Sequence, residues 1–200
     1  MKTIGITGPT GAGKTTALAA LQRLGALVID ADAVYHRLTR QSARLRQLLE
    51  TGFGPVYDSE GNLDRKRLGE VVFQDQQALA ELNRITHAVV GEEIWRLLDQ
   101  AELEGRQCAA IDAIALIESG LSVFCDAVVG VVAPAEVRIE RIKKREGISE
   151  EYARLRVSAQ KGEDYYRQHC SYILENTGED APECFSARAE ALFHRILSAT

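Results

Sequence analysis

The sequence lacks the features that mark proteins stabilised by a structural metal, secreted proteins and membrane-spanning proteins. Its four cysteines lie far apart and form no CxxC pair, which favours reduced thiols in a cytosolic protein over a zinc site or a disulfide framework. The most apolar stretch, residues 127–135, has about half the length that a membrane span needs. The apolar stretch within the first eight residues is too short for a signal peptide and is interrupted by glycine. We therefore expect a cytoplasmic protein with no membrane partner.

A surplus of basic residues is also absent. The chain has 24 Lys and Arg against 29 Asp and Glu, a formal net charge of −5. Nucleic-acid-binding proteins usually carry a basic surplus that displaces counterions from phosphates, so we expect no nucleic-acid partner. The 200 residues are 46% hydrophobic and 26% charged, without repeats or linkers. This composition predicts a single globular domain, residues 1–200, that folds without a metal or a disulfide.

Short apolar runs alternate with stretches of helical periodicity. The runs at 2–7, 26–30, 107–112 and 127–132 are typical of strands, and 172–174 is a possible fifth strand. Runs that are apolar on both faces belong to parallel strands covered by helices on either side. Helical patterns occupy 14–24, 65–73, 78–85, 89–104, 134–146 and 184–197, and residues 45–72 are less regular. The alternation predicts a doubly wound α/β fold.

The segment from Gly8 to Thr15 matches the phosphate-binding pattern G-x-x-x-x-G-K-[ST] in full. Glycines let backbone N–H groups converge on phosphate oxygens, and the positive end of the following helix points at the same place. Lys14 is expected to bridge the β- and γ-phosphates, and the Thr15 hydroxyl to ligate Mg²⁺. A dinucleotide-binding loop fits less well, because its third glycine would fall at Thr16. We expect ATP to contact Gly8, Pro9, Thr10, Gly11, Ala12, Gly13, Lys14, Thr15 and Thr16.

Three carboxylates, Asp30, Asp32 and Asp112, end predicted strands. Ligands of parallel α/β sheets bind outside the carboxyl ends of the strands, so these acids are expected to face one crevice. Asp30 and Asp32 point to the same side if the backbone is still extended there. From the residues alone, Asp32 is more readily the N-cap of a helix at 33–40, and Asp30 a turn residue. Whether Asp30 or Asp112 lies nearer a metal stays open.

Arg138, Arg141 and Arg145 recur on one stripe of the helix predicted at 134–146. Arginines of this kind close over a triphosphate and neutralise charge on the migrating group. Without other information, a solvated helix face that pairs through Glu140 is the simpler interpretation. His87 ends a helical pattern, and a lone histidine there is more often structural than catalytic.

The combination of motifs resembles the dephospho-coenzyme A kinases, P-loop kinases of the nucleoside-monophosphate-kinase type. The resemblance covers residues 4–178. Besides the phosphate-binding loop, it rests on L-G-A-x-V-I-D-A-D at 24–32, F-G at 53–54, G-x-L-D-R-x-x-L at 61–68, L-N-x-x-x-H at 82–87, R-x-x-x-R at 141–145, R-x-x-x-Q at 156–160 and N-x-G at 176–178.

The resemblance implies a P-loop three-layer sandwich with a mainly parallel sheet, a helical substrate-binding subdomain at about 35–104 and a helical lid at about 134–160. It also implies ATP- and Mg²⁺-dependent transfer of the γ-phosphoryl group to the ribose 3′-hydroxyl of dephospho-CoA, the last step of coenzyme A biosynthesis. Its small-molecule partners are then ATP and dephospho-CoA. We expect a monomer or a weak homo-oligomer.

The same resemblance assigns roles to individual residues and reverses the preference for Asp32 as a cap. The implied catalytic residues are Asp32, Lys14 and Arg141, with Arg145 as a second arginine at the phosphates. The implied acceptor-side residues are Asp32, Arg65, His87, Asp112 and Gln160, and the implied metal ligands are Thr15 and Asp112.

Some positions depart from the family pattern. Pro9, Thr10, Ala12 and Thr15 replace its usual loop residues but keep the general phosphate-binding pattern, and Cys170-Ser171 replaces an Ala-Asp pair. Alanine at 88 and isoleucine at 114 replace prolines, which bears on the acceptor pocket. A P-loop kinase for another hydroxyl acceptor and a non-catalytic CoA- or nucleotide-binding paralogue remain the alternatives. A GTPase-like switch is disfavoured because the guanine-reading motif N-K-x-D is absent.

Overall fold

The computed structural model describes residues 1–179 and 181–199, and these contain one five-stranded sheet. The strand order is β2-β3-β1-β4-β5, and every neighbouring pair is parallel. The strands are β1 (Lys2–Thr7), β2 (Leu27–Asp30), β3 (Cys108–Asp112), β4 (Ala127–Val132) and β5 (Tyr172–Glu175). Each lies within one residue of the run that predicted it, so the expected α/β fold with a parallel sheet is confirmed.

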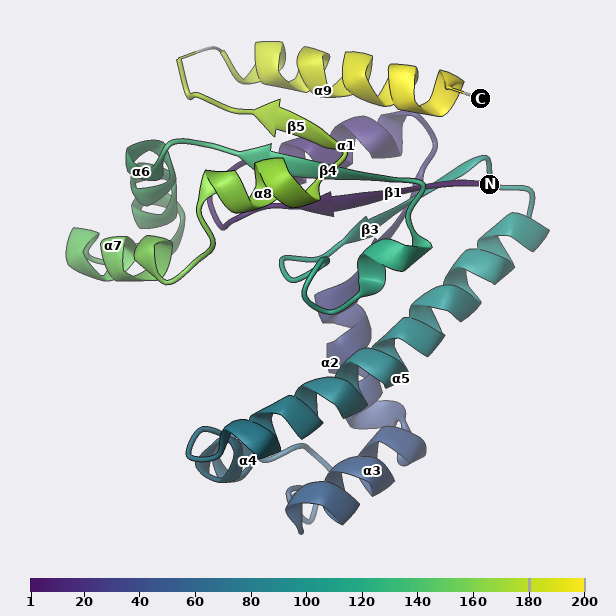
Figure 1. Cartoon of the computed structure of the whole chain (residues 1–200), viewed down its shortest axis with the longest axis vertical. Coiled ribbons are helices and arrows are strands. Elements are labelled where there is room, and N and C mark those ends of the chain that lie inside the picture. Colours follow the sequence, from purple (N-terminus) through teal and green to yellow (C-terminus); the bar gives the residue numbers. More distant parts are fainter. Residues whose placement is uncertain (180, 200) are drawn as a thin grey trace.

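Helices cover both faces of the sheet, and a separate core fills each interface (Figure 1). On one face, α1 (Lys14–Arg23) and α9 (Pro182–Ser198) pack on Ile4 and Ile6 of β1 and on Val129 of β4. On the other, α2 (Ala31–Gln41) and α5 (Gln76–Leu103) cover Ile29 and Ile111, and α8 (Glu163–His169) packs on β4. The central strands β1 and β3 are therefore buried on both faces, which holds their carboxyl ends in place.

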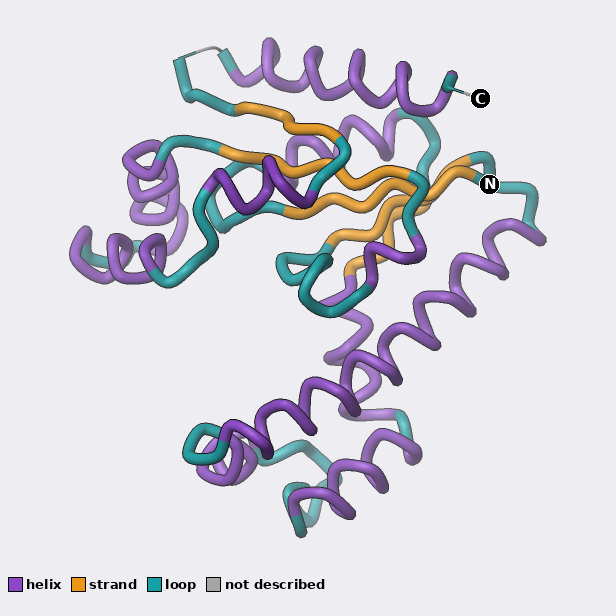
Figure 2. Tube along the Cα trace, in the orientation of Figure 1, coloured by secondary structure: helices purple, strands orange, loops and turns teal. Residues whose placement is uncertain are grey.

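The second half of α2 and the first half of α5 leave the sheet and form an arm with α3 (Ala43–Phe53) and α4 (Arg65–Val72). This arm has its own core, centred on Leu45, Leu49, Val56, Leu68 and Ile85. The prediction of two helices at 78–85 and 89–104 was wrong, since Figure 2 shows one uninterrupted helix, α5. Its apolar face changes partner along its length, from the arm core at Ile85 to the sheet core at Ile94. That change breaks the sequence periodicity without breaking the helix.

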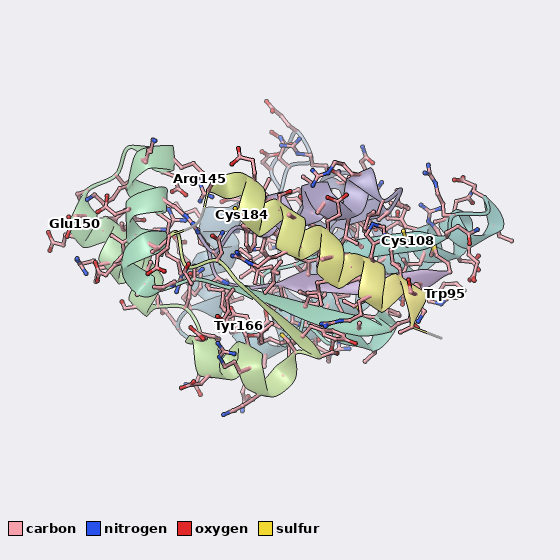
Figure 3. All side chains as sticks on the ribbon, turned by 90° about the horizontal axis from the view of Figure 1, so that it is seen from above. Trp95, Cys108, Arg145, Glu150, Tyr166 and Cys184 are labelled. Carbon is pink, nitrogen blue, oxygen red and sulfur yellow. The ribbon has the colours of Figure 1, made fainter. Side chains whose placement is uncertain are left out.

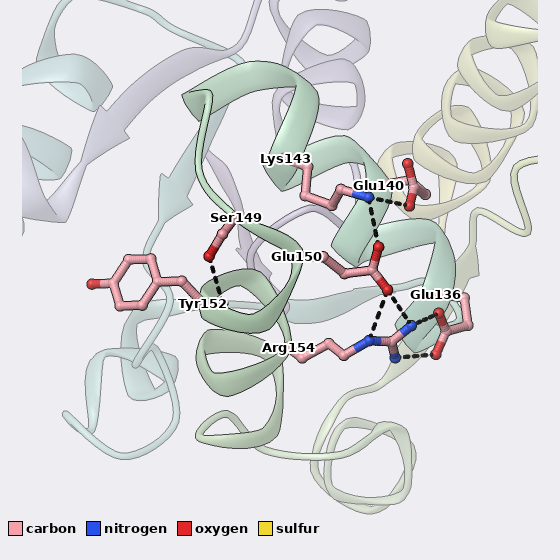
Figure 4. Close-up of polar contacts among 7 residues, drawn as sticks. All are labelled: Glu136, Glu140, Lys143, Ser149, Glu150, Tyr152 and Arg154. Carbon is pink, nitrogen blue, oxygen red and sulfur yellow. Dashed lines mark hydrogen bonds and ion pairs between the residues drawn. The ribbon is translucent and has the colours of Figure 1, made fainter.

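Helices α6 (Ala135–Glu146) and α7 (Glu150–Ser158) form a hairpin beside the carboxyl ends of the strands (Figure 1). Ile139, Ile142, Ala153 and Val157 bury the surface between them. Ion pairs join the outer sides of both helices, as Figure 4 shows; they involve Glu136, Glu140, Lys143, Glu150 and Arg154. These pairs are exposed, so the apolar contact stabilises the hairpin more than they do. Across the part of the chain that the structure describes, no helix is both long and apolar enough to cross a membrane.

Candidate active site

The phosphate-binding loop runs from the end of β1 to the start of α1, and its backbone bends in ways that require glycine. Gly8, Gly11 and Gly13 have φ angles of 141°, 82° and 111°, all in the left-handed region. A Cβ atom on Gly8 would lie 2.1 Å from the carbonyl oxygen of Val131 in β4. A Cβ on Gly13 would lie 2.4 Å from the Asn176 side-chain nitrogen. The loop is therefore held close to its neighbours by residues that have no side chain.

Replacing Gly8 with alanine is expected to destabilise the protein and to disrupt the loop. Backbone strain at this φ costs about 1–3 kcal/mol, and the clash with the Val131 oxygen adds to it. Gly105→Ala is the matched control: its φ is also positive, at 76°, but a Cβ there meets nothing within 4 Å. Urea unfolding compares the two variants. An equal loss of stability in both would contradict the close approach of Gly8 to β4.

Lys14 opens α1 and turns its side chain back over the loop. Its ammonium nitrogen donates a hydrogen bond to the Gly8 carbonyl oxygen at 2.9 Å. Burial lowers the pKa of Lys14, while the negative charges of Asp112 and Asp32 act in the opposite direction. In the described part of the chain, no carboxylate forms an ion pair with it. A cation held by one carbonyl oxygen is well placed to exchange that bond for a phosphate oxygen.

Two arginines of α6 hold the loop from the outside. Arg138 is 6% exposed; its Nε donates to the Thr10 carbonyl oxygen at 3.0 Å, and its Nη2 donates to Gln160 at 2.6 Å. Arg141 donates to the Gly11 carbonyl oxygen at 3.1 Å and to the Asn176 side-chain oxygen at 2.9 Å. The interpretation of this stripe as a solvated face is therefore wrong for both residues.

Arg145, the third member of the stripe, is different. Its side chain is 59% exposed and pairs with the adjacent Glu146 at 2.6 Å. It still lines the same cavity as Lys14 and Arg141. Glu140, the partner that the solvated-face interpretation required, pairs instead with Lys143.

The cavity in front of the loop has a volume of about 310 Å³ and brings the predicted cations and acids together. Its charged and hydroxyl-bearing lining residues are Thr10, Lys14, Thr15, Asp30, Asp32, Asp112, Arg141 and Arg145. This set contains all three of the predicted carboxylates, so the prediction that they face one crevice is confirmed. Ile114 lines this cavity as well.

The three carboxylates differ in their surroundings. Asp30 is the N-cap of α2, and its Oδ1 accepts from the Ala33 backbone nitrogen at 2.9 Å. Asp32 is exposed in the first turn of that helix, so the extended backbone and the N-cap role considered for it were both wrong. The helix starts at Ala31, two residues earlier than expected, because Asp30 supplies the cap. Asp32 is thereby free of local hydrogen bonding to the helix end.

Asp112 ends β3 beneath this cavity, and its Oδ1 atom is buried without a hydrogen-bond partner among the described residues. Burial raises the pKa of its carboxyl group, the positive charge of Lys14 opposes that rise, and Asp30 and Asp32 add to it. A buried oxygen that lacks a partner is costly in a folded protein and marks a place for a ligand or an ion. Of the two acids left open as neighbours of a metal, Asp112 has a buried oxygen without a partner, whereas Asp30 uses one oxygen to cap α2.

Asp112→Asn is expected to stabilise the ligand-free protein at neutral pH. Because the pKa of Asp112 is raised in the folded state, its ionised form is destabilising there, and this penalty disappears as pH falls towards the usual value of 3.8. The gain in the free energy of unfolding therefore shrinks as pH is lowered through the raised pKa. Urea unfolding at several pH values measures it. A variant that is less stable at neutral pH would contradict the assigned direction.

A second cavity, of about 240 Å³, lies on the arm side of Asp32. Asp32 lines both cavities and is the residue that their described linings share. The second cavity is enclosed by α2, α5 and the segment after β3; besides Asp32, its lining includes Tyr35, Leu82, Asn83, Thr86, His87, Val90, Ala113 and Ser119. Burial lowers the pKa of His87, which favours the neutral form of its imidazole. The two cavities therefore meet at one exposed carboxylate.

Two residues that were predicted on the acceptor side, Arg65 and Gln160, do not line the second cavity. The Arg65 guanidinium contacts the His36 Nδ1 atom at 2.6 Å, beside the lining residue Tyr35. Gln160 is placed elsewhere, with its side chain bonded to Thr10 of the phosphate loop at 3.1 and 2.9 Å. The packing of α7 on α6 brings Gln160 to the loop instead of to the arm.

Asn176 is a loop-supporting residue to which the sequence interpretation gave no role. Its amide nitrogen donates to the Ala12 carbonyl oxygen at 2.9 Å, and its side-chain oxygen accepts from Arg141. It directly follows β5, the edge strand beside β4. The N-x-G motif at 176–178 was the signal that could have pointed to it.

Comparison with known proteins agrees with this geometry. The family model described as dephospho-CoA kinase matches residues 2–181. The chain belongs to the dephospho-CoA kinase family. A dephospho-CoA kinase from Corynebacterium diphtheriae is 37% identical over 179 residues, which cover 89% of this chain and 90% of that protein. Family membership makes the chain a phosphoryl-transferring kinase.

Solved structures show the same fold. A protein from Thermus thermophilus superposes with a TM-score of 0.77 at 30% identity, covering 100% of this chain and 98% of its own. A dephospho-CoA kinase from Campylobacter jejuni superposes with a TM-score of 0.59 at 22% identity, covering 98% and 97% of the two chains. The resemblance implied by the motifs is therefore confirmed, and so is the P-loop kinase fold.

Proposed function

We propose that this protein transfers the γ-phosphoryl group of ATP to the ribose 3′-hydroxyl of dephospho-CoA and so makes coenzyme A. Membership of the family and the kinase names of its relatives support this activity. The observation that carries it is the position of Asp32, which lies in both the phosphate-loop cavity and the arm-side cavity. A phosphoryl donor and a hydroxyl acceptor that occupy these hollows meet at one carboxylate.

On the donor side, the loop from Gly8 to Thr15 would bind the ATP phosphates through its backbone N–H groups. Lys14 would bridge the β- and γ-phosphates, and Arg141 would neutralise charge on the migrating group from the α6–α7 hairpin. The absence of carboxylate partners for both cations, within the described residues, supports these roles. Arg145 lines the same cavity from an exposed position, so closure of the hairpin would bring it onto the phosphates.

Asp32 would accept a hydrogen bond from the 3′-hydroxyl, orient it for in-line attack and take its proton. Its exposure in the first turn of α2 leaves its carboxylate oxygens open to the acceptor. Phosphoryl transfer passes through a loose transition state, so orientation and charge neutralisation contribute more than the basicity of the carboxylate. This geometry is available because Asp30, and not Asp32, caps the helix.

The residues present fit a magnesium ion. Thr15 and Asp112 both line the phosphate-loop cavity, and their hydroxyl and carboxylate oxygens are the hard ligands that Mg²⁺ prefers. The described residues contain no group of three or more His, Cys, Asp or Glu side chains that could hold a metal alone. This is the arrangement of an ion held by one or two protein oxygens together with substrate phosphates. When bound, Mg²⁺ would neutralise negative charge between the β- and γ-phosphates.

The acceptor would bind in the arm-side cavity, which makes residues 35–104 the substrate-binding subdomain and residues 134–160 the lid. His87 lines that cavity, and its lowered pKa favours the neutral imidazole as a hydrogen-bonding group. Arg65 has no carboxylate partner in the described part of the chain; it contacts His36 and lies near the lining residue Tyr35. It would supply positive charge for the acceptor diphosphate.

Each cavity is built from one chain, so a monomer contains every residue that the mechanism uses. A cytoplasmic location is consistent with the four cysteines, all of which are free thiols in the structure.

The test is ADP release from Mg-ATP with dephospho-CoA, with its 3′-deoxy analogue, and with neither. The proposal predicts release that depends on dephospho-CoA and is lost when the 3′-hydroxyl is missing. Release with the 3′-deoxy analogue would assign the transfer to a different hydroxyl. ATP binding without release in any mixture would favour the non-catalytic alternative, and a small alcohol that alone promotes release would favour another acceptor.

A further inference from the structure

An apolar groove runs along the outer side of α5, between that helix and the short helix η1 (Leu121–Phe124). Its volume is about 490 Å³, and it is lined mainly by Ala88, Gly91, Trp95, Val123 and Phe124. Trp95 is 58% exposed and Val123 is 79% exposed, unusually open positions for large apolar side chains. The donor side of the proposed reaction uses none of these residues.

The groove continues the arm-side cavity. His87, Ser119 and Leu121 line both hollows, so a ligand that starts beside Asp32 can pass His87 and enter the groove. The groove leads away from the phosphate loop: Figure 3 shows Trp95 at the opposite end of the molecule from Arg145 and Glu150. An occupant of the groove would therefore be the distal part of the acceptor.

The size of the arm-side cavity requires such an extension. At about 240 Å³ it is smaller than the ~300–1,000 Å³ of pockets that enclose drug-sized ligands. Dephospho-CoA consists of an adenosine unit, a diphosphate and a long pantetheine arm, so only part of it fits beside Asp32. The adjoining groove is the larger of the two hollows.

We propose that the groove between α5 and η1 binds the pantetheine arm of dephospho-CoA, an inference that rests on the proposed function. The arm is uncharged, and it presents methyl and methylene groups, two amides and a terminal thiol. The groove offers matching chemistry, with apolar walls and the Ser119 and His87 polar groups at its junction with the cavity. The acidic lining residue Glu92 is paired with Arg44, so the groove carries little net charge towards a ligand.

The first test uses Trp95 as a reporter. It is the single tryptophan of the chain, so the tryptophan emission of the whole protein comes from this groove. Dephospho-CoA and 4′-phosphopantetheine are expected to change the emission in a saturable manner, and adenosine 5′-phosphate and ATP are not. Emission that responds to adenosine 5′-phosphate but not to 4′-phosphopantetheine would place the nucleotide end in the groove and overturn the proposal.

The second test uses Val123→Glu, which puts a charge into the groove at an exposed position that folding does not require. The expected result is a rise of about tenfold or more in KM for dephospho-CoA, or roughly 1.4 kcal/mol of lost binding, with KM for ATP unchanged. Competitive inhibition by 4′-phosphopantetheine is expected to weaken in parallel. Leu103→Glu is the matched control, since Leu103 is 78% exposed on α5 outside the groove.

The outcomes separate this proposal from the function on which it rests. Normal turnover of dephospho-CoA, with unchanged KM in Val123→Glu and unchanged Trp95 emission, overturns the groove assignment and leaves the kinase activity standing. A wild-type protein that does not phosphorylate dephospho-CoA overturns the function and the groove assignment together. Equal effects of Val123→Glu and Leu103→Glu would show a general charge effect and would also overturn the groove assignment.

Discussion

Asp32→Asn is expected to lower kcat by about 10²–10⁴, the usual contribution of a positioned proton acceptor, with only a modest change in the affinity for ATP. Asparagine keeps the size and much of the polarity of the side chain but loses the negative charge that receives the hydroxyl proton. Asp32 is exposed and lies outside the helix cap, so the substitution is not expected to destabilise α2. Steady-state kinetics with each substrate varied in turn give the two parameters.

Asp99→Asn is the matched control for this experiment. Asp99 is also an exposed aspartate on a helix, but it lies in α5 and lines neither cavity. The control is expected to keep wild-type kcat and KM. Near-normal kcat in Asp32→Asn would contradict the assigned role, and so would a loss confined to KM for ATP, because Asp32 would then act in donor binding alone.

Lys14→Ala is expected to reduce kcat/KM for ATP by about 10²–10³, the effect of removing one preorganised donor from a developing negative charge. The ammonium group is already aimed into the loop by its bond to the Gly8 carbonyl oxygen. Without it, the phosphates would face the carboxylates of Asp32 and Asp112 with less positive charge to offset them. The measurements are initial rates of ADP formation and ATP binding by calorimetry.

Lys2→Ala controls for the loss of a lysine that lies away from the loop. Lys2 begins β1 at the opposite end from the loop, and its ammonium group bonds to the Ala199 carbonyl oxygen. Wild-type kinetics are expected for this variant. Full activity in Lys14→Ala would contradict the assignment of the loop as the ATP site.

The sheet and the phosphate loop could be predicted from the sequence because each depends on local information. The strands are short apolar runs with clear ends, and the loop pattern fixes the glycines that a left-handed backbone requires. The arm was harder to predict. Helix α5 packs on the sheet with one half and on the arm core with the other, so no single apolar stripe runs along its length.

The site shows the same division between local and non-local information. The sequence predicted that Asp30, Asp32 and Asp112 face one crevice, because each was expected to end a parallel strand. Asp32 lies instead in the first turn of α2, which keeps it at the same edge of the sheet. From the residues alone it favoured Asp32 as the cap of α2, and the structure shows Asp30 in that place. Both have the residue type that caps helices, and only the helix start decides between them. Gln160 was assigned to the acceptor side, and the packing of α7 on α6 carries it to the phosphate loop. That packing depends on tertiary contacts between separate helices.

The most direct test of the central claim is to incubate the wild-type protein with Mg-ATP and dephospho-CoA and to identify the product by mass and by its ribose resonances. The account predicts one ADP per product molecule and a product heavier than dephospho-CoA by a single phosphoryl group on the ribose 3′-oxygen. A phosphoryl group on another oxygen, or unchanged dephospho-CoA beside bound ATP, would contradict it.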